Sequence, residues 1–151
     1  MNILKSITTI ILLGAIFMTT PALAQIKERD KTVPFSELPG AIQQYVKSHF
    51  PNQSVTKVEV EMKGTEKAYE VKLDDKTELE FNSQLQVEKI ESKNALPAST
   101  LPTSIQTYVR ANYPNNAIKE WEIEKKHQEV KLDNGIALKF DLEGAFLRIG
   151  K

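Results

Sequence analysis

The stretch VPFSELPGAIQQYVKSHFPNQSVTKVEVE, residues 33–61, decides the fold, because the chain repeats it as LPASTLPTSIQTYVRANYPNNAIKEWEIE at residues 96–124. The two stretches share 12 identities in 29 positions at an offset of 63. A second motif, EVKLD at residues 70–74, returns at residues 129–133 with an offset of 59, so the second copy is four residues shorter around residues 64–67. Two copies of one supersecondary unit predict a single pseudo-symmetric body.

Each copy opens with the apolar spacing of a helix. In the first copy the apolar stripe ends at Phe50-Pro51-Asn52, because a residue before proline is disfavoured in the α region. Ser36 is a plausible N-cap for this helix. The stripes consist of Leu38, Ile42, Tyr45, Val46 and His49 in the first copy, and of Leu101, Ile105, Tyr108 and Val109 in the second. We expect Tyr45 and Tyr108, which occupy matching positions, to pack against a sheet.

Downstream of each helix the apolar period changes from 3.6 to 2, which is typical of half-buried antiparallel strands. The Asn134-Gly135 pair predicts a type I′ hairpin turn, and Asp75-Lys76 fills that place more weakly in the first copy. Each unit therefore reads α-β-β-β-β, with residues 91–100 as the connector. The predicted strands cover residues 58–62, 69–73, 79–81 and 85–90, and then 118–124, 129–133, 136–141 and 145–149.

The first 24 residues have the pattern of a secretory signal peptide. Lys5 supplies the positive region, residues 7–18 form a short apolar run, and Ala22-Leu23-Ala24 offers a cleavage site before Gln25. The apolar run is shorter than the roughly 20 residues that span a bilayer. We therefore expect a periplasmic or secreted protein without stable membrane insertion. The expected organisation is a signal peptide at 1–24, a flexible segment at 25–32, repeat one at 33–91 and repeat two at 92–151.

The charge balance and the lack of cysteine exclude several functions. The 20 acidic side chains match the 20 basic ones, so no net positive field favours nucleic acid. Without cysteine there are no disulfides, thiol nucleophiles or thiolate metal ligands. We expect no cofactor and no metal.

The order of these motifs resembles the PepSY-like family, which is related to the β-lactamase-inhibitor-protein fold. The motifs are leucine-proline, the helical stripe, aromatic-proline-asparagine, and alternating strands that end in V-K-L-D-x-G. The resemblance covers residues 33–150, nearly the whole chain after the signal. It implies an α+β fold in which two tandem repeats form one curved antiparallel sheet of about eight strands, with helices on one face. It also implies a secreted, non-catalytic module that binds or inhibits other proteins.

Few residues suggest chemistry. His49 lies on the apolar stripe, which favours a packing role over catalysis, and His127 lies in a shortened hairpin, which favours a solvated loop residue. Trp121 replaces Val58 and is expected to fill the core, the alternative being that it marks an edge of a binding surface. The acidic turns at residues 74–75 and 133–135 are explained by their turn role, although a cation there stays an open question. Glutamates alternate with lysines along the strands, so cross-strand pairing is favoured over an acid/base pair.

Three hypotheses for function follow. The favoured one is an exported binding module that contacts an unknown exported or envelope protein through its open sheet face. The alternatives are a small periplasmic hydrolase that uses paired carboxylates, and a passive envelope protein. We expect no catalytic residue, and the proposed partner surface consists of Glu59, Glu61, Glu70, Lys72, Glu78, Glu80, Glu122, Glu124 and Lys131.

Overall fold

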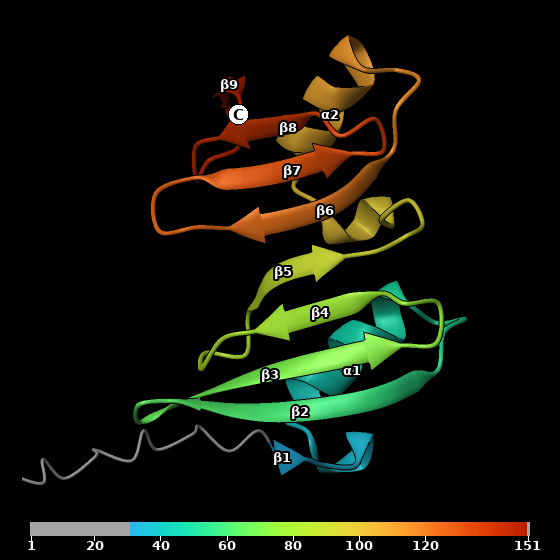
Figure 1. Ribbon diagram of the computed structural model, residues 1–151, viewed down its shortest axis with the longest axis vertical. Coiled ribbons are helices and arrows are strands. Elements are labelled where there is room, and N and C mark those ends of the chain that lie inside the picture. The colour runs from blue at the N-terminus through green and yellow to red at the C-terminus, as the bar shows by residue number, and fades with distance from the viewer. Residues whose placement is uncertain (1–30, 151) are drawn as a thin grey trace, which may run out of the picture.

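The computed structural model describes residues 31–150, and these residues form one nine-stranded antiparallel sheet. The strands follow one another in the sheet in chain order, and the two α-helices lie behind one face of it (Figure 1). This confirms the expected α+β class and the two tandem units. The elements are β1 Lys31–Thr32, η1 Phe35–Glu37, α1 Gly40–His49, β2 Val55–Lys63, β3 Glu66–Leu73, β4 Glu78–Phe81, β5 Val87–Glu91, η2 Ala98–Thr100, α2 Thr103–Asn112, β6 Ile118–Ile123, β7 Gln128–Leu132, β8 Ala137–Phe140 and β9 Phe146–Ile149.

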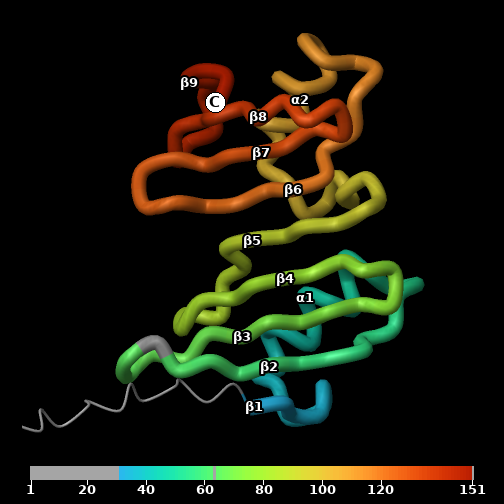
Figure 2. The backbone as a smooth tube through the Cα atoms, viewed as in Figure 1, coloured from blue at the N-terminus to red at the C-terminus, as the bar shows by residue number. Residues whose placement is uncertain are grey.

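The chain follows the same path twice, a helix and then four strands (Figure 2). Even the irregularities repeat: the register shifts between Glu80 and Phe81 where β4 meets β5, and between Lys139 and Phe140 where β8 meets β9. The ninth strand, β1, was not expected from the sequence. It comes from the last two residues of the predicted segment 25–32 and pairs with β2, Thr32 lying opposite Glu59. The signal peptide lies outside the described residues.

The core fills the space between the helices and the inner sheet face. Ile42 of α1 and Ile105 of α2 are fully buried, as are Phe81 and Phe140 at matching positions of β4 and β8. Tyr45 meets Phe81 edge-on with ring centroids 5.6 Å apart, and Tyr108 meets Phe140 edge-on at 5.4 Å. The predicted packing of both tyrosines is confirmed.

The expected capping of α1 by Ser36 is wrong. The helix begins at Gly40 with Pro39 at the N-cap position, and Ser36 lies in the preceding η1 turn. Neither α-helix has a side-chain N-cap, and a glutamine of the helix holds the preceding turn in each repeat. The Gln43 side-chain amide donates to the carbonyls of Ser36 and Leu38, and that of Gln106 donates to the carbonyls of Ala98 and Leu101. Proline at the N-cap leaves no hydroxyl to accept from the helix, so the entry turn is held from inside the helix instead.

The predicted type I′ turn at Asn134-Gly135 is also wrong. That turn requires positive φ at both central residues, and here Gly135 has φ of 85° whereas Asn134 is not among the residues with positive φ. The amide of Gly135 donates to the carbonyl of Leu132, and Leu132 donates to Ile136. Lys76 takes the same place in repeat one with φ of 70°, so a lysine there adopts the left-handed conformation that favours glycine.

Candidate functional site on the charged sheet face

The face of the sheet opposite the helices carries a row of side chains that crosses all nine strands. The row is fixed by strand register, each member lying opposite the next, and it begins at Thr32 of β1. We call it the central row: Thr32, Glu59, Glu70, Glu80, Lys89, Glu122, Glu129, Lys139 and Arg148. Period-2 alternation predicted a charged face, and the register shows that the row is acidic on β2–β4, mixed on β5–β7 and basic on β8–β9.

A second row runs parallel to the first, on the side nearer the turns that join β3 to β4 and β7 to β8. It consists of Lys57, Lys72, Glu78, Glu91, Glu120 and Lys131, again in consecutive register. Two ion pairs link the rows: the Lys72 ammonium lies 2.9 Å from Glu70, and that of Lys57 lies 2.7 Å from Glu59. A third, within the second row, places the Lys72 ammonium 3.4 Å from Glu78. Cross-strand and same-strand pairing of glutamate with lysine is thus present over much of the face, as the alternation predicted.

The nine residues of the predicted partner surface fall into two groups. Six of them lie together on β2, β3 and β4: Glu59, Glu61, Glu70, Lys72, Glu78 and Glu80. Glu122 and Lys131 lie on β6 and β7, on the same face but separated from the first group by β5. Glu124 follows β6 in the hairpin to β7, where its amide donates to the carbonyl of His127. The acidic patch therefore belongs mainly to repeat one.

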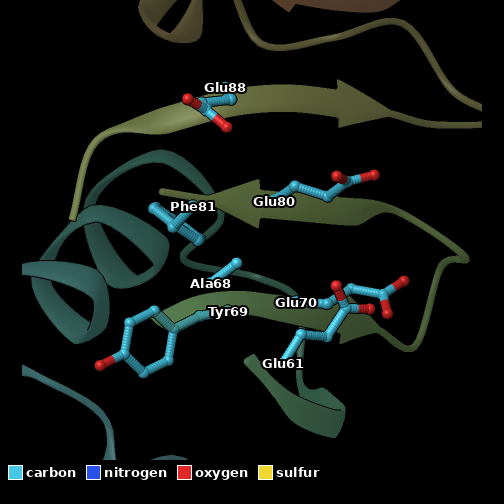
Figure 3. A pocket seen from close by; sticks show the side chains of 7 residues that line it. All are labelled: Glu61, Ala68, Tyr69, Glu70, Glu80, Phe81 and Glu88. Carbon is cyan, nitrogen blue, oxygen red and sulfur yellow. The ribbon is translucent and has the colours of Figure 1, made fainter. Parts of the chain in front are cut away.

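Within this patch, carboxylates lie opposite one another, an arrangement that ordinarily destabilises a sheet. Glu59, Glu70 and Glu80 are consecutive partners across β2, β3 and β4. A shallow pocket gathers four glutamates, and Figure 3 shows the Glu61 and Glu70 carboxylates side by side with Glu80 on the next strand. The pocket is lined by Glu61, Ala68, Tyr69, Glu70, Glu80, Phe81 and Glu88. Among the described side chains, no ion pair joins Glu61, Glu80 or Glu88 to a base.

The pKa values of Glu59 and Glu70 are shifted in opposite directions. Burial raises the pKa of Glu70 above its ordinary value, with smaller contributions from the charges of Glu78 and Glu59, against the lowering effect of Lys72. The hydrogen bond from Lys57 lowers the pKa of Glu59. Glu70 therefore binds a proton more readily than a free glutamate does, because it is partly withdrawn from water between two other carboxylates.

Among the charged residues of this face that the predicted partner surface did not include, Glu120 is the one that is buried. Glu120 is only 8% exposed, although it lies on the charged face, because Lys131 and Lys89 cover it. Its carboxylate is 2.8 Å from the Lys131 ammonium and 3.7 Å from that of Lys89, and the hydrogen bond that Lys131 donates to Glu120 raises the pKa of Lys131. The available signal was the repeat itself: Glu120 aligns with Lys57, so the charge at this position is inverted between the copies.

The two histidines lie away from the acidic patch. His49 packs on Tyr45 with ring centroids 4.3 Å apart, and its Nδ1 lies 2.8 Å from the Ser99 hydroxyl of the second repeat, so its expected packing role is confirmed. His127 is more enclosed than a solvated loop residue, with 20% of its side chain exposed. It lies with Glu124 and Glu129 at metal-ligand spacing. The Lys139 ammonium lies among these three groups, 2.9 Å from both His127 and Glu129, and already supplies a positive charge there.

Trp121 is 5% exposed and fills the core opposite Ile90, as expected from its alignment with Val58. Its indole N–H donates to the side-chain oxygen of Gln128 at 2.9 Å. The Gln128 amide in turn donates to the carbonyls of Asp141 and Leu142. This buried polar chain is complete, so the tryptophan is a structural residue of the second repeat rather than the edge of a binding surface.

Comparisons with known proteins agree with this architecture. The family described as "Putative beta-lactamase-inhibitor-like, PepSY-like" matches the chain twice, over residues 16–89 and 67–148. The chain belongs to this PepSY-like family. The double match reflects the internal repeat, because each copy carries the helix and strands of one family unit. No curated protein matches the chain.

Solved structures of similar proteins come from Bacteroides. One, from Bacteroides thetaiotaomicron and described as a "putative calcium-regulated periplasmic protein", is 33% identical, with a TM-score of 0.76 over 81% of this chain and 97% of that one. A protein of the DUF2874 family from Bacteroides vulgatus, described as a "putative periplasmic protein", is 32% identical, also with a TM-score of 0.76 over 81% of this chain and 97% of that one. A second periplasmic protein from that organism is 30% identical, with a TM-score of 0.75 over 82% of this chain and 100% of that one.

These structural relatives are thus described as periplasmic proteins. Among residues 31–150, no helix is both long and apolar enough to cross a membrane.

Proposed function

We propose that this PepSY-like protein is an exported, non-catalytic module that binds another protein through the acidic end of its charged sheet face. The observation that carries the proposal is the central row, which is fixed in register across the whole sheet and lies on the face that neither α-helix covers. A rigid sheet presents these charges in a fixed spacing, so a complementary surface could recognise their pattern. The periplasmic descriptions of the relatives support the location.

The chemistry of the face indicates what kind of partner it fits. Three consecutive carboxylates, Glu59, Glu70 and Glu80, face outward on β2–β4. Lys89 lies opposite Glu80 in register, but among the described side chains no ion pair joins Glu80 to a base. A partner with a basic patch would supply the missing positive charge. Electrostatic complementarity speeds association and is screened by salt, so binding should weaken as ionic strength rises.

The non-catalytic part of the proposal rests on where the reactive side chains lie. His49 is committed to Tyr45 and Ser99, and His127 is held between Glu124 and Lys139. Neither histidine lines the acidic pocket.

The test uses purified protein and the exported fraction of its source. Cross-linking should capture a partner with the wild-type protein, and capture should decline at high salt and with the double reversal Glu59→Lys/Glu61→Lys. The matched control is Glu37→Lys/Glu143→Lys, which makes the same change of net charge at exposed positions outside the sheet face. The proposal is refuted if capture of the partner changes neither with salt nor with Glu59→Lys/Glu61→Lys, or if Glu37→Lys/Glu143→Lys reduces capture as much as the face reversal does. It is also refuted if the purified protein turns over a substrate and a substitution of Glu70 abolishes that activity.

Calcium regulation is a second candidate function, favoured by the four glutamates of the pocket in Figure 3 and by the description of the B. thetaiotaomicron relative. Calcium takes six to eight oxygen ligands, and a bound cation would offset the repulsion between carboxylates that lie opposite one another. Added Ca²⁺ should then raise the melting temperature of the wild-type protein but not that of Glu70→Gln/Glu80→Gln. Glu78→Gln/Glu91→Gln, in the second row, is the matched control. This candidate function is eliminated if added Ca²⁺ leaves the melting temperatures of all three proteins unchanged.

A further inference from the structure

The two edges of the sheet end differently. At the first edge, β1 is two residues long, carries Lys31, and is continued by Val33, whose amide donates to the carbonyl of Val58. Short strands and lysines are the usual means of protecting a sheet edge from pairing. At the other edge β9 presents Leu147 and Ile149, which are 53% and 56% exposed. Within residues 31–150 no strand pairs with the outer edge of β9.

The internal repeat shows what covers such an edge elsewhere in the same molecule. The counterpart of β9 is β5: Ile90 lies opposite Leu79 as Ile149 lies opposite Leu138, and both strands carry the same register shift. The outer edge of β5 is paired with β6, where Trp121 lies opposite Ile90 and Glu122 lies opposite Lys89. Ile90 is consequently fully buried, whereas Ile149 remains more than half exposed.

The positions that differ between β5 and β9 also favour an interaction at this edge. Leu147 takes the place of Glu88, so an exposed charge of repeat one becomes an exposed apolar side chain at the open edge. Arg148 keeps the positive charge of Lys89 in the central row. In β5 that charge has Glu122 as its cross-strand partner, and in β9 the equivalent place is vacant among the described residues.

We propose that the outer edge of β9 is a docking edge for an extended strand of another protein, added antiparallel to β9 as β6 is added to β5. The template gives the chemistry of the incoming strand: a large apolar side chain opposite Ile149 and a carboxylate opposite Arg148. Main-chain hydrogen bonds would supply affinity, and these two side chains would supply specificity. This edge is separate from the acidic patch on β2–β4, so the inference goes beyond the proposed function and does not depend on it.

A second copy of the chain fits this edge less well. Its β2, the counterpart of β6, already pairs with β1 and with Val33, so head-to-tail addition would require β1 to leave. In an isologous β9–β9 pair that overlaps all four residues, apolar Leu147 would lie opposite Arg148, and centring the pair on Arg148 would oppose two like charges. The partner strand is therefore assigned to a different protein.

The test uses the template itself as the probe. A peptide with the sequence of residues 117–124, AIKEWEIE, is added to the isotope-labelled full chain, and amide chemical shifts are followed by NMR. We expect shifts concentrated at residues 146–149. Replacing the peptide's tryptophan and the glutamate that follows it by lysine should abolish them. In the protein, Ile149→Lys should weaken binding by about tenfold or more.

Leu142→Lys is the matched control, because Leu142 is 50% exposed but precedes β9 in the loop. It should leave peptide binding unchanged, and because both positions are exposed, both variants should fold. The proposal is overturned if Ile149→Lys binds the peptide as tightly as the wild type does. It is also overturned if the chemical-shift changes concentrate at β1 instead of β9, or if the peptide causes no change at all. Concentration-dependent dimerisation of the chain that is lost in Ile149→Lys would assign the edge to a second copy and would equally overturn it.

Discussion

Trp121 of the second repeat lies directly opposite Ile90 of the first, and this pair joins the two halves into one sheet. Both side chains are buried, and they lie at the centre of the β5–β6 junction, between Lys89–Glu122 and Glu91–Glu120. A repeat that ended at β5 would leave Ile90 exposed, as Ile149 is at the end of β9. The junction is therefore built from the same strand edge that remains open in the second copy.

Trp121→Ala should destabilise the protein by about 3–5 kcal/mol, the range for truncating a large buried aromatic side chain. The loss combines the cavity beside Ile90 with the loss of the bond to Gln128, whose side-chain oxygen would be left without its donor. Urea unfolding monitored by circular dichroism measures it. Val58→Ala, at the equivalent position of repeat one, removes fewer atoms and should cost less; equal costs would mean that the junction does not depend on the tryptophan.

Gln106→Met should cost about 1–2 kcal/mol, because its side-chain amide donates to two main-chain carbonyls at the entry to α2, at 2.7 Å and 2.8 Å. Methionine keeps the length of the side chain and removes both bonds. Gln44→Met, at an exposed position of α1, is the control and should be nearly neutral. Thermal unfolding of the two variants, compared with the wild type, decides the point. Similar melting temperatures would show that the entry turn is held by packing alone.

Lys76→Gly should stabilise the protein by about 1 kcal/mol. Lys76 has φ of 70°, a conformation that costs an L residue about 1–2 kcal/mol relative to glycine, and part of this gain is offset by the greater freedom of glycine in the unfolded chain. The reciprocal change, Gly135→Ala at φ of 85°, should destabilise by a similar amount. Chemical denaturation of both variants measures the two effects. Opposite signs are required, and destabilisation by Lys76→Gly would contradict the turn assignment.

Tyr45→Phe should leave the protein as stable as the wild type or about 1 kcal/mol more stable, because the Tyr45 hydroxyl is buried without a hydrogen-bond partner among the described residues. Truncation is different: Tyr45→Ala and Tyr108→Ala should each cost about 3 kcal/mol through lost packing. Equilibrium unfolding at neutral pH separates the two kinds of change. A cost below about 1 kcal/mol for both alanine variants would contradict the packing seen here.

The same hydroxyl predicts a pH dependence. Burial raises the pKa of Tyr45 from 10.0 to about 12, so the folded state holds the phenolic proton more tightly than the unfolded chain does. This contribution to stability is fully present below pH 10 and is lost as the pH rises from about 10 to about 12. Wild-type stability should therefore fall more steeply across this window than that of Tyr45→Phe. Parallel curves for the two proteins would show that Tyr45 ionises freely in the folded state.

The repeat and its two periods determined most of the fold. Helical spacing before each aromatic-proline-asparagine motif predicted α1 and α2, and alternation predicted strands β2 to β9, because burial of one face imposes a fixed period on each element. Details set by backbone conformation were missed. Ser36 was assigned a capping role, although α1 has no side-chain cap and begins after Pro39. Asn134-Gly135 was assigned a type I′ turn. Both assignments failed because several local conformations suit the same turn residues.

The candidate site divides in the same way. The sequence by itself determined that Glu59, Glu70 and Glu80 face outward, since alternation fixes the side of a strand on which each residue lies. Only the tertiary structure decided that they oppose one another in one row, that Lys131 and Lys89 cover Glu120, and that Ile149 stays exposed while Ile90 is buried. Alternation is a property of one strand, whereas register and edge position depend on which strands pair, and pairing is set by long-range contacts that no single segment encodes.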